Sequence, residues 1–308
     1  MNQARTKRVR DLVDGVLLLD KPVGLSSNDA LIKAKRILNA KKAGHTGTLD
    51  PFATGLLPLC FGEATKFSQD LLEADKTYLT TVHLGQRTDT GDTEGQVLES
   101  RDVNVTQEQI EAVLEKFRGP IDQVPPMYSA LKRDGKPLYE YAREGITLER
   151  EARRVTIHEL EFVSYEAPFL KLKVTCSKGT YIRVLGEDIG AALGCGAHLN
   201  ALRRVQVGAL TTDRMITLEE LAAHEAPLSL LSPVDTLLSS FPRIVLTEAL
   251  AKRFLNGQRL PLGKEPEVQL PSTYTGRVRV YHDERLLGTA LLQEYGILAP
   301  ERLISVAN

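Results

Sequence analysis

The sequence predicts an α+β fold followed by a small β-rich domain. Strand and helix signals occur along the whole chain, but they do not alternate as the regular βαβ units of a parallel sheet do. Residues 170–176 alternate apolar and polar side chains, which is typical of a strand with one buried face. After Pro242 the pattern changes to one short helix and then to short strands around 277–281, 285–292 and 295–299.

A chain of 308 residues has the length of about two domains. We therefore predict a main domain over residues 1–241 and a smaller domain over residues 242–308.

The first predicted elements are a strand and a helix with a basic face. Residues 15–19 form a short apolar run and predict a buried strand. Ser26 to Asp29 can cap a helix that continues to about Leu38, with its apolar positions at helical spacing. Residues 30–45 hold five Lys or Arg residues and no acidic residue, so this segment carries a local positive charge.

The later elements are bounded by caps and turns. Thr106 to Gln109 match a capping box, and Gly194 is suited to the end of a helix. In order, we predict strands at 78–84 and from Val97, a helix behind Thr106 that stops at Gly119, the strand at 170–176, a helix at about 182–193, a helix opened by Thr217, and a helix from Thr247 to Leu255.

One long polar excursion interrupts these elements. Residues 124–154 begin with Pro125-Pro126 and contain seven Lys or Arg residues and five Asp or Glu residues, with tyrosines between them. Excursions of this length are usually functional or disordered.

Charge and hydropathy exclude several classes of protein. The 39 Lys and Arg against 40 Asp and Glu give a formal charge of −1, which excludes a uniformly basic nucleic-acid coat but allows one basic surface. The longest strongly apolar stretch, residues 55–62, contains Pro58 and is much shorter than the ~18 residues of a membrane span. The apolar run of residues 16–19 is too short for a secretion signal. Three cysteines without paired spacing predict reduced thiols in a cytoplasmic protein.

The densest chemical signal is the glycine-rich segment 44–55, which carries His45 and Asp50. It has no Lys for a phosphate-binding P-loop, and Thr48 stands where an H-x-G-H nucleotidyl-transfer motif needs a second His. The chain has no G-x-S-x-G motif and no metal-ligand spacing. A single carboxylate that acts as nucleophile or base, without a cofactor motif, is the chemistry that remains.

This segment belongs to a set of motifs that resembles the TruB family of tRNA pseudouridine synthases. The match runs in order from about residue 14 to residue 215, and several separated motifs at family-like intervals make it specific. The motifs are Gly15–Pro22, Ser26–Asn28, Gly44–Pro51, Lys76–Tyr78, Gly85–Thr90 and Ser177–Arg183.

The resemblance implies a pseudouridine synthase fold with a mixed, mainly antiparallel sheet, and a PUA-like C-terminal domain. The family isomerises the uridine conventionally numbered 55 in the T-loop of tRNA. The reaction cleaves the N1–C1′ bond, turns the base and joins C5 to C1′. Because this base lies inside a folded loop, the enzyme must flip it out. No metal, nucleotide or redox cofactor is implied.

The resemblance also assigns the catalytic residues. Asp50 is implied to be the catalytic aspartate, which can attack the ribose or the uracil ring or take a ribose proton. Arg183 is implied to pair with Asp50 and keep it ionised. Tyr78 is implied to stack on the flipped uracil, and its hydroxyl can serve the proton transfer at C5.

Four further residues match positions around the substrate. Tyr181 and Leu202 match residues that line the uracil pocket. His45 matches a residue that contacts the displaced nucleotide, and Lys21 matches a lysine that supports the loops near the site.

The implied partner is tRNA, and no obligate protein partner is implied. Residues 124–154 resemble a thumb insertion that closes over the T-arm, and the part after Pro242 is implied to contact the acceptor end. RNA binding should weaken as salt rises, because phosphate contacts are salt-sensitive. The candidate phosphate contacts are Lys33, Lys35, Arg36, Lys41, Lys42, Arg203 and Arg204.

Two other functions stay open from the residues themselves. One is a tRNA-binding or folding module without catalysis, against which the intact set of Asp50, Tyr78 and Arg183 argues. The other is a nucleotidyl or phosphoryl transferase that uses the His45 loop and requires ATP and Mg²⁺.

Overall fold

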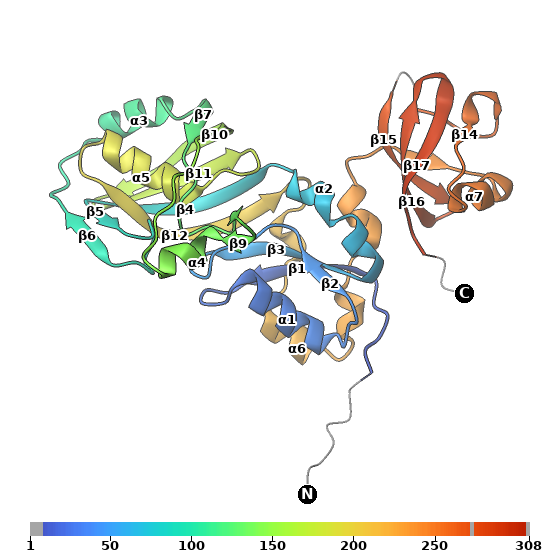
Figure 1. The fold of residues 1–308 in the computed structure, drawn as a ribbon, viewed down its shortest axis with the longest axis horizontal. Helices are drawn as coiled ribbons and strands as arrows, with labels where there is room; N and C mark the ends of the chain where they lie inside the picture. The colour runs from blue at the N-terminus through green and yellow to red at the C-terminus, as the bar shows by residue number, and fades with distance from the viewer. Residues whose placement is uncertain (1–8, 272–273, 306–308) are drawn as a thin grey trace, which may run out of the picture.

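The computed structural model describes residues 9–271 and 274–305. Its larger part is built on an eight-stranded sheet (Figure 1). All neighbouring strands run antiparallel except β12 and β3, so the predicted mixed, mainly antiparallel sheet is confirmed. The strands, in sheet order, are β1 (Gly15–Lys21), β3 (Thr54–Phe61), β12 (Ala197–Val207), β4 (Lys76–Leu84), β11 (Phe169–Cys176), β10 (Arg153–Glu166) and β7 (Gly119–Gln123), with β2 (Ala43–His45) beside β3.

Four helices share one hydrophobic core with this sheet. The cluster takes in buried side chains of all four, among them Leu31, Ile110, Leu185 and Leu221. In Figure 1, α1 and α6 lie together near β1, while α3 and α5 lie over the other end of the sheet. The helices are α1 (Ser27–Ile37), α3 (Gln107–Glu115), α5 (Ile182–Ala192) and α6 (Leu218–Ala223).

The predicted helix starts are confirmed at the level of hydrogen bonds. The Ser26 side chain accepts from Asp29 N, and complete capping boxes begin at Thr106 and Thr217. At the other end of α5, Gly190 lets the helix lie directly against β12, because a Cβ at this position would come within 2.4 Å of the Ala197 Cβ. This close packing fixes the helix that begins at Tyr181.

Five strands of the sheet were not predicted: β2, β3, β7, β10 and β12. Pro58 interrupts the apolar run of β3, yet the strand continues through it, paired along β1, and the Pro58 carbonyl accepts Thr46 N at 3.2 Å. Strand β10 begins inside the polar excursion, where charged side chains alternate with buried ones on a sheet with one open face.

The polar excursion is an ordered insertion between β7 and β10. It contains a short hairpin and one short helix, and no larger element lies in it. A second small hairpin follows β4. The elements are β8 (Lys132–Arg133), β9 (Lys136–Pro137) and α4 (Leu138–Arg143) in the insertion, and β5 (Gln86–Thr88) and β6 (Val97–Ser100) after β4.

The C-terminal part forms a five-stranded sheet with a hydrophobic cluster of its own, which confirms the predicted β-rich, PUA-like unit (Figure 1). It meets the larger part through α2 (Ser68–Leu72), whose buried Asp70 lies 2.5 Å from Arg277 and 3.5 Å from Arg302. The elements, in sheet order, are β13 (Arg243–Val245), β15 (Gly276–His282), β16 (Arg285–Gln293), β17 (Ile297–Leu303) and β14 (Leu260–Pro261), with α7 (Glu248–Leu255) packed beside them.

Among the described residues, none of the helices combines the length and the apolar character that a membrane crossing requires.

Candidate active site

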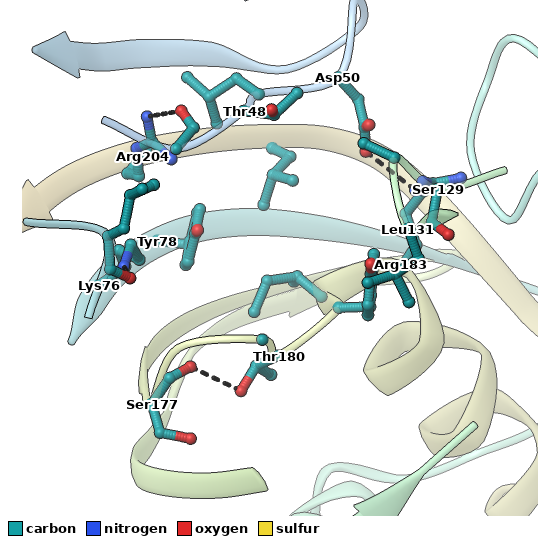
Figure 2. A pocket seen from close by; sticks show the side chains of 18 residues that line it. Thr48, Asp50, Lys76, Tyr78, Ser129, Leu131, Ser177, Thr180, Arg183 and Arg204 are labelled. Atoms are coloured by element: carbon teal, nitrogen blue, oxygen red, sulfur yellow. Dashed lines mark hydrogen bonds and ion pairs between the residues drawn. The ribbon is translucent and has the colours of Figure 1, made fainter. Parts of the chain in front are cut away.

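A pocket of about 340 Å³ lies where β4 and β12 run side by side (Figure 2). Its walls come from segments that are far apart in the sequence. They are residues 47–50 ahead of β3, Lys76 and Tyr78 of β4, residues 129–131 of the insertion, residues 177–183 around the start of α5, and Leu202 and Arg204 of β12.

The loop that carries Asp50 is anchored on both sides of the carboxylate. Leu49 N donates to Ser27 Oγ at 2.7 Å, and the same hydroxyl donates to Leu49 O at 3.0 Å. On the other side, Lys21 Nζ donates to Pro51 O at 3.3 Å. The Asp50 side chain, 36% exposed, therefore projects from a fixed backbone and stays accessible from the pocket.

Arg183 is buried in the first turn of α5 and connects three segments. Its Nε lies 3.0 Å from Asp50 Oδ2. Its Nη1 donates to Thr90 O at 2.8 Å, and its Nη2 donates to Tyr128 O at 2.6 Å. A second carboxylate, that of Asp92, lies 3.5 Å from Nη1. The structure thus brings Asp50 and Arg183 together and ties both to the start of the insertion.

Two opposing influences act on the pKa of Asp50. Burial raises this pKa above the ordinary value, the guanidinium of Arg183 lowers it, and the nearby charge of Asp92 raises it again, so that the net direction is upward. The sequence led us to expect that Arg183 pairs with Asp50 and favours its ionised form. The pair is present and the guanidinium acts in that direction, but it offsets the effect of burial only in part.

Tyr78 and Leu202 supply an apolar surface to the pocket. The two side chains are 8% and 7% exposed. They come from neighbouring strands, with Leu202 opposite Thr80 in the register of β12 and β4. Burial raises the pKa of Tyr78, so its hydroxyl is protonated at neutral pH. A planar ring can lie against this surface below Asp50.

Tyr181 lines the same pocket and is tied to the end of β7. Its backbone N donates to Gln123 Oε1 at 3.0 Å, and Gln123 Nε2 donates to Tyr181 O at 3.3 Å. The amide of Gln123 therefore fixes the residue immediately before α5. The structure places Asp50, Arg183, Tyr78, Tyr181 and Leu202 around one cavity, as the motifs predicted.

His45 lies in a neighbouring cavity of about 550 Å³, which also reaches Asp50 and Arg183. Its buried Nδ1 has no hydrogen-bond partner among the described residues. Burial lowers the pKa of His45, so the imidazole is neutral at pH 7. The second cavity adjoins the exposed side of the Asp50 carboxylate and continues toward Tyr139 of the insertion.

Lys21 is fully buried and supports loops instead of facing a substrate. Its Nζ donates to Pro22 O at 2.9 Å and to Leu25 O at 2.6 Å, besides Pro51 O. Burial lowers its pKa to about 8. The sequence attached two roles to Lys21, which are support of the loops and contact with the substrate. The structure favours the first role over the second.

We expect Lys21→Met to lower the free energy of unfolding by about 3 kcal/mol, because three backbone carbonyls lose their buried donor. Urea unfolding followed by circular dichroism measures this loss. The exposed Lys41→Met is the matched control and should shift the midpoint little. Equal midpoints for the two variants would show that the Lys21 contacts add no stability.

One arginine lies elsewhere than predicted, and two acids near the site were not predicted. Arg204 was predicted as a surface phosphate contact, but it is 1% exposed and lies inside the pocket wall. Arg203 is engaged with Asp20 through two hydrogen bonds of 2.8 and 2.9 Å.

The two acids lie next to the catalytic candidates: Asp92 is buried beside Arg183, and Glu94 lines the second cavity. The only sequence signal for these acids was the acidic turn at residues 89–94, which has no metal-ligand spacing.

No cluster of three or more His, Cys, Asp or Glu side chains that could hold a metal ion occurs among residues 9–271 and 274–305. The pocket residues above are those of acid–base and electrostatic chemistry on an organic substrate.

Three family models cover most of the chain. Residues 35–182 match the N-terminal domain of the TruB family pseudouridylate synthases. Residues 183–239 match the C-terminal domain of tRNA pseudouridylate synthase B, and residues 242–304 match a second TruB C-terminal model. A protein from Burkholderia lata named tRNA pseudouridine synthase B is 62% identical over 305 residues, which cover 98% of this chain and 94% of that protein.

The chain belongs to the TruB family. It is therefore a pseudouridine synthase, an isomerase. A protein of the same name from Ralstonia nicotianae is 60% identical, and the aligned residues cover 97% of this chain and 97% of that protein. The motif-based resemblance, which ended near residue 215, extends in these relatives over nearly the whole chain.

Solved structures with this fold include chains that were determined within larger complexes. A Cbf5-Nop10-Gar1 complex contains a chain with a TM-score of 0.74 and 26% identity, covering 95% of this chain and 85% of that one. An H/ACA RNP bound to a substrate RNA containing 2′-deoxyuridine contains a chain with a TM-score of 0.74 and 25% identity, covering 96% and 86%. The predicted pseudouridine synthase fold is thus confirmed.

Proposed function

We propose that this pseudouridine synthase isomerises the T-loop uridine of tRNA, with Asp50 as the catalytic carboxylate and Tyr78 and Arg183 as its partners. The observation that carries the proposal is the 3.0 Å contact between Arg183 and Asp50 at a pocket lined by Tyr78 and Leu202. A carboxylate held by a buried guanidinium, next to an apolar surface against which a planar ring can lie, suits the attack on one everted nucleotide.

The reaction needs no external electron carrier, because the product is an isomer of the substrate. The N1–C1′ bond breaks, the base turns, the C5–C1′ bond forms, a proton leaves C5, and N1 ends with a proton. Asp50 assists by attack on the ribose or the base, or by removal of a ribose proton. The Tyr78 hydroxyl is the proposed acceptor or relay for the C5 proton, and its ring supports the flipped base.

We propose that the T-arm lies across the two cavities, with the insertion closing over it. Support comes from His45 and Tyr139, which line the second cavity, and from the carbonyl of Tyr128, which holds Arg183. Exposed cations on and beside α1 supply phosphate contacts near this opening. They are Lys33, Arg36, Lys41 and Lys42.

We propose further that the chain divides into a catalytic domain of residues 1–241 and a PUA-like domain of residues 242–308, which contacts the acceptor end of tRNA. The C-terminal hydrophobic cluster contains only residues from Ile244 onward, which supports a separate unit.

Release of tritium from C5-labelled uridine in an unmodified T-arm hairpin tests this function. We expect release in the presence of a metal chelator and without added nucleotide. Tight binding of the hairpin without release would identify a non-catalytic RNA-binding module. Release that requires ATP and Mg²⁺ would favour a transferase instead.

The raised pKa of Asp50 predicts a pH dependence of the isomerisation rate. A carboxylate with a raised pKa takes up its proton at a higher pH than an ordinary aspartate, so the rate of the bound complex should fall as pH drops through that raised value. Single-turnover rates measured from neutral pH downward, over the range in which the protein stays folded, record this acid limb. Arg183→Gln should move the limb to still higher pH, and rates that do not fall in either protein down to the pKa of an ordinary aspartate would contradict a raised pKa of a catalytic Asp50.

A further inference from the structure

The pocket holds two buried arginines whose charges are balanced differently. Arg183 lies against the carboxylates of Asp50 and Asp92. Arg204, 1% exposed, has no carboxylate within 4.0 Å among the described residues. The two guanidinium groups stand at opposite ends of the cavity, with Tyr78 between them in the view of Figure 2. At one end of the pocket two carboxylates face one guanidinium, whereas the other end carries an excess of positive charge.

The contacts of Arg204 leave part of its guanidinium free. Its Nε donates to Leu56 O at 2.8 Å, and its Nη2 donates to Gly47 O at 3.2 Å. No backbone carbonyl or carboxylate among the described residues accepts from its Nη1, and the guanidinium faces the Tyr78 hydroxyl within hydrogen-bonding reach. A Cβ placed on Gly47 would lie in van der Waals contact with this Nη1, at 3.7 Å, and with Lys76 Cε, at 3.9 Å, so the Gly47 loop passes close to both side chains.

Lys76 adds a second positive charge at the same end. Its Nζ donates to three backbone carbonyls around the end of α2, to Leu71 O at 3.3 Å, Leu72 O at 2.9 Å and Ala74 O at 2.5 Å, so Lys76 acts on the pocket through its charge. Its pKa is lowered to about 8, mainly by burial and further by the charge of Arg204. The same guanidinium also acts to lower the pKa of Tyr78 against the effect of burial. The field of Arg204 thus extends over this end of the pocket.

Two cations buried without a carboxylate are costly in an empty pocket and become favourable when an anion arrives. A phosphodiester would have to bring the continuous RNA backbone to an arginine that is 1% exposed, whereas an everted base enters the pocket by itself. A planar base edge fits between Tyr78, Leu202 and Arg204. During isomerisation the base itself becomes such an anion, because the electron pair of the N1–C1′ bond leaves with the uracil.

We propose that Arg204, assisted by Lys76, binds the detached uracil as an anion and stabilises it until the C5–C1′ bond forms. The assignment rests on the proposed function of this pocket. The negative charge that leaves with N1 spreads over the two carbonyl oxygens of the ring. Arg204 Nη1 donates a hydrogen bond to one of these oxygens. The electron pair returns to the ribose when C5 attacks C1′. The C5 proton is then released and N1 is protonated, so the charge on the base is transient.

The test measures how strongly the pocket prefers an anionic base. A T-arm hairpin with 5-fluorouridine at the target position is bound to Asp50→Asn, which should not turn it over, and the loss of the N3 proton is followed by fluorine NMR. The fluorine makes that proton acidic near neutral pH. We expect its pKa to fall by about one unit or more on binding, a tenfold preference for the anion. An unchanged pKa would overturn the proposal.

Two substitutions separate the charge of Arg204 from its support of the Gly47 loop. In the Asp50→Asn background, Arg204→Lys keeps the charge and should keep most of the pKa shift, whereas Arg204→Gln keeps a hydrogen-bond donor and should lose it. In the otherwise wild-type protein, Arg204→Gln should slow the single-turnover rate about 100-fold or more, and Arg204→Lys should slow it much less. Equal effects of both substitutions would leave Arg204 a structural residue only. Conversion of uridine by the wild-type protein without any shift would refute this inference and leave the proposed function intact.

Discussion

We expect Asp50→Asn to reduce isomerisation of a T-arm hairpin by at least about 1000-fold, while the affinity for the RNA stays within a few-fold. The substitution keeps the shape of the side chain but removes the charge and the capacity to act as nucleophile or base. Arg183 keeps its bonds to the carbonyls of Thr90 and Tyr128 and its contact with Asp92, so the pocket should keep its form. Single-turnover tritium release and a filter-binding titration measure the two quantities separately.

Asp75→Asn is a matched control, since Asp75 is exposed and does not line the pocket. Its rate should equal that of the wild type. Near-normal turnover by Asp50→Asn would remove Asp50 from the catalytic role, whatever the control shows.

The second large effect is expected for Tyr78→Phe. The ring that supports the base remains, but the hydroxyl proposed to serve the C5 proton is lost, and the rate should fall about 100-fold or more. RNA affinity and the unfolding midpoint should change little, because the buried aromatic surface is retained. A deuterium isotope effect at C5 should grow in the variant, since proton removal then becomes slower relative to the other steps.

Tyr165→Phe removes a hydroxyl from β10, where the ring packs against the main core outside the pocket, and should leave the rate unchanged. If Tyr78→Phe behaves like this control, the hydroxyl of Tyr78 takes no part in the reaction and only its ring matters.

Local signals predicted most of the helices because they act within a few residues. Side-chain caps at Ser26, Thr106 and Thr217 begin the helices that the structure contains. Strand β3 was missed because Pro58 removes a backbone donor, and only the pairing with β1 shows that the strand tolerates it. Strand β12 was missed because its polar residues are satisfied by distant partners, such as Asp20 for Arg203.

The motifs predicted the members of the site but not its charge balance. Asp50, Tyr78 and Arg183 lie in separate motifs, and the sheet brings them to one cavity. The burial of Arg204, however, follows from its place on a central strand beside β4 and β3, which a single sequence does not reveal. In the sequence, Arg203 and Arg204 are adjacent and look equivalent. In the sheet they point to opposite faces, so one pairs with Asp20 and the other enters the pocket wall.

Nucleotide-resolution mapping of pseudouridine tests the central claim most directly. An unmodified T-arm hairpin is incubated with the wild-type protein and with Asp50→Asn, both with chelator and without nucleotide. We predict a single pseudouridine at the T-loop uridine with the wild type and none with the variant. No modification by the wild type, or equal modification by both proteins, would contradict the proposal that Asp50 and its pocket isomerise this base.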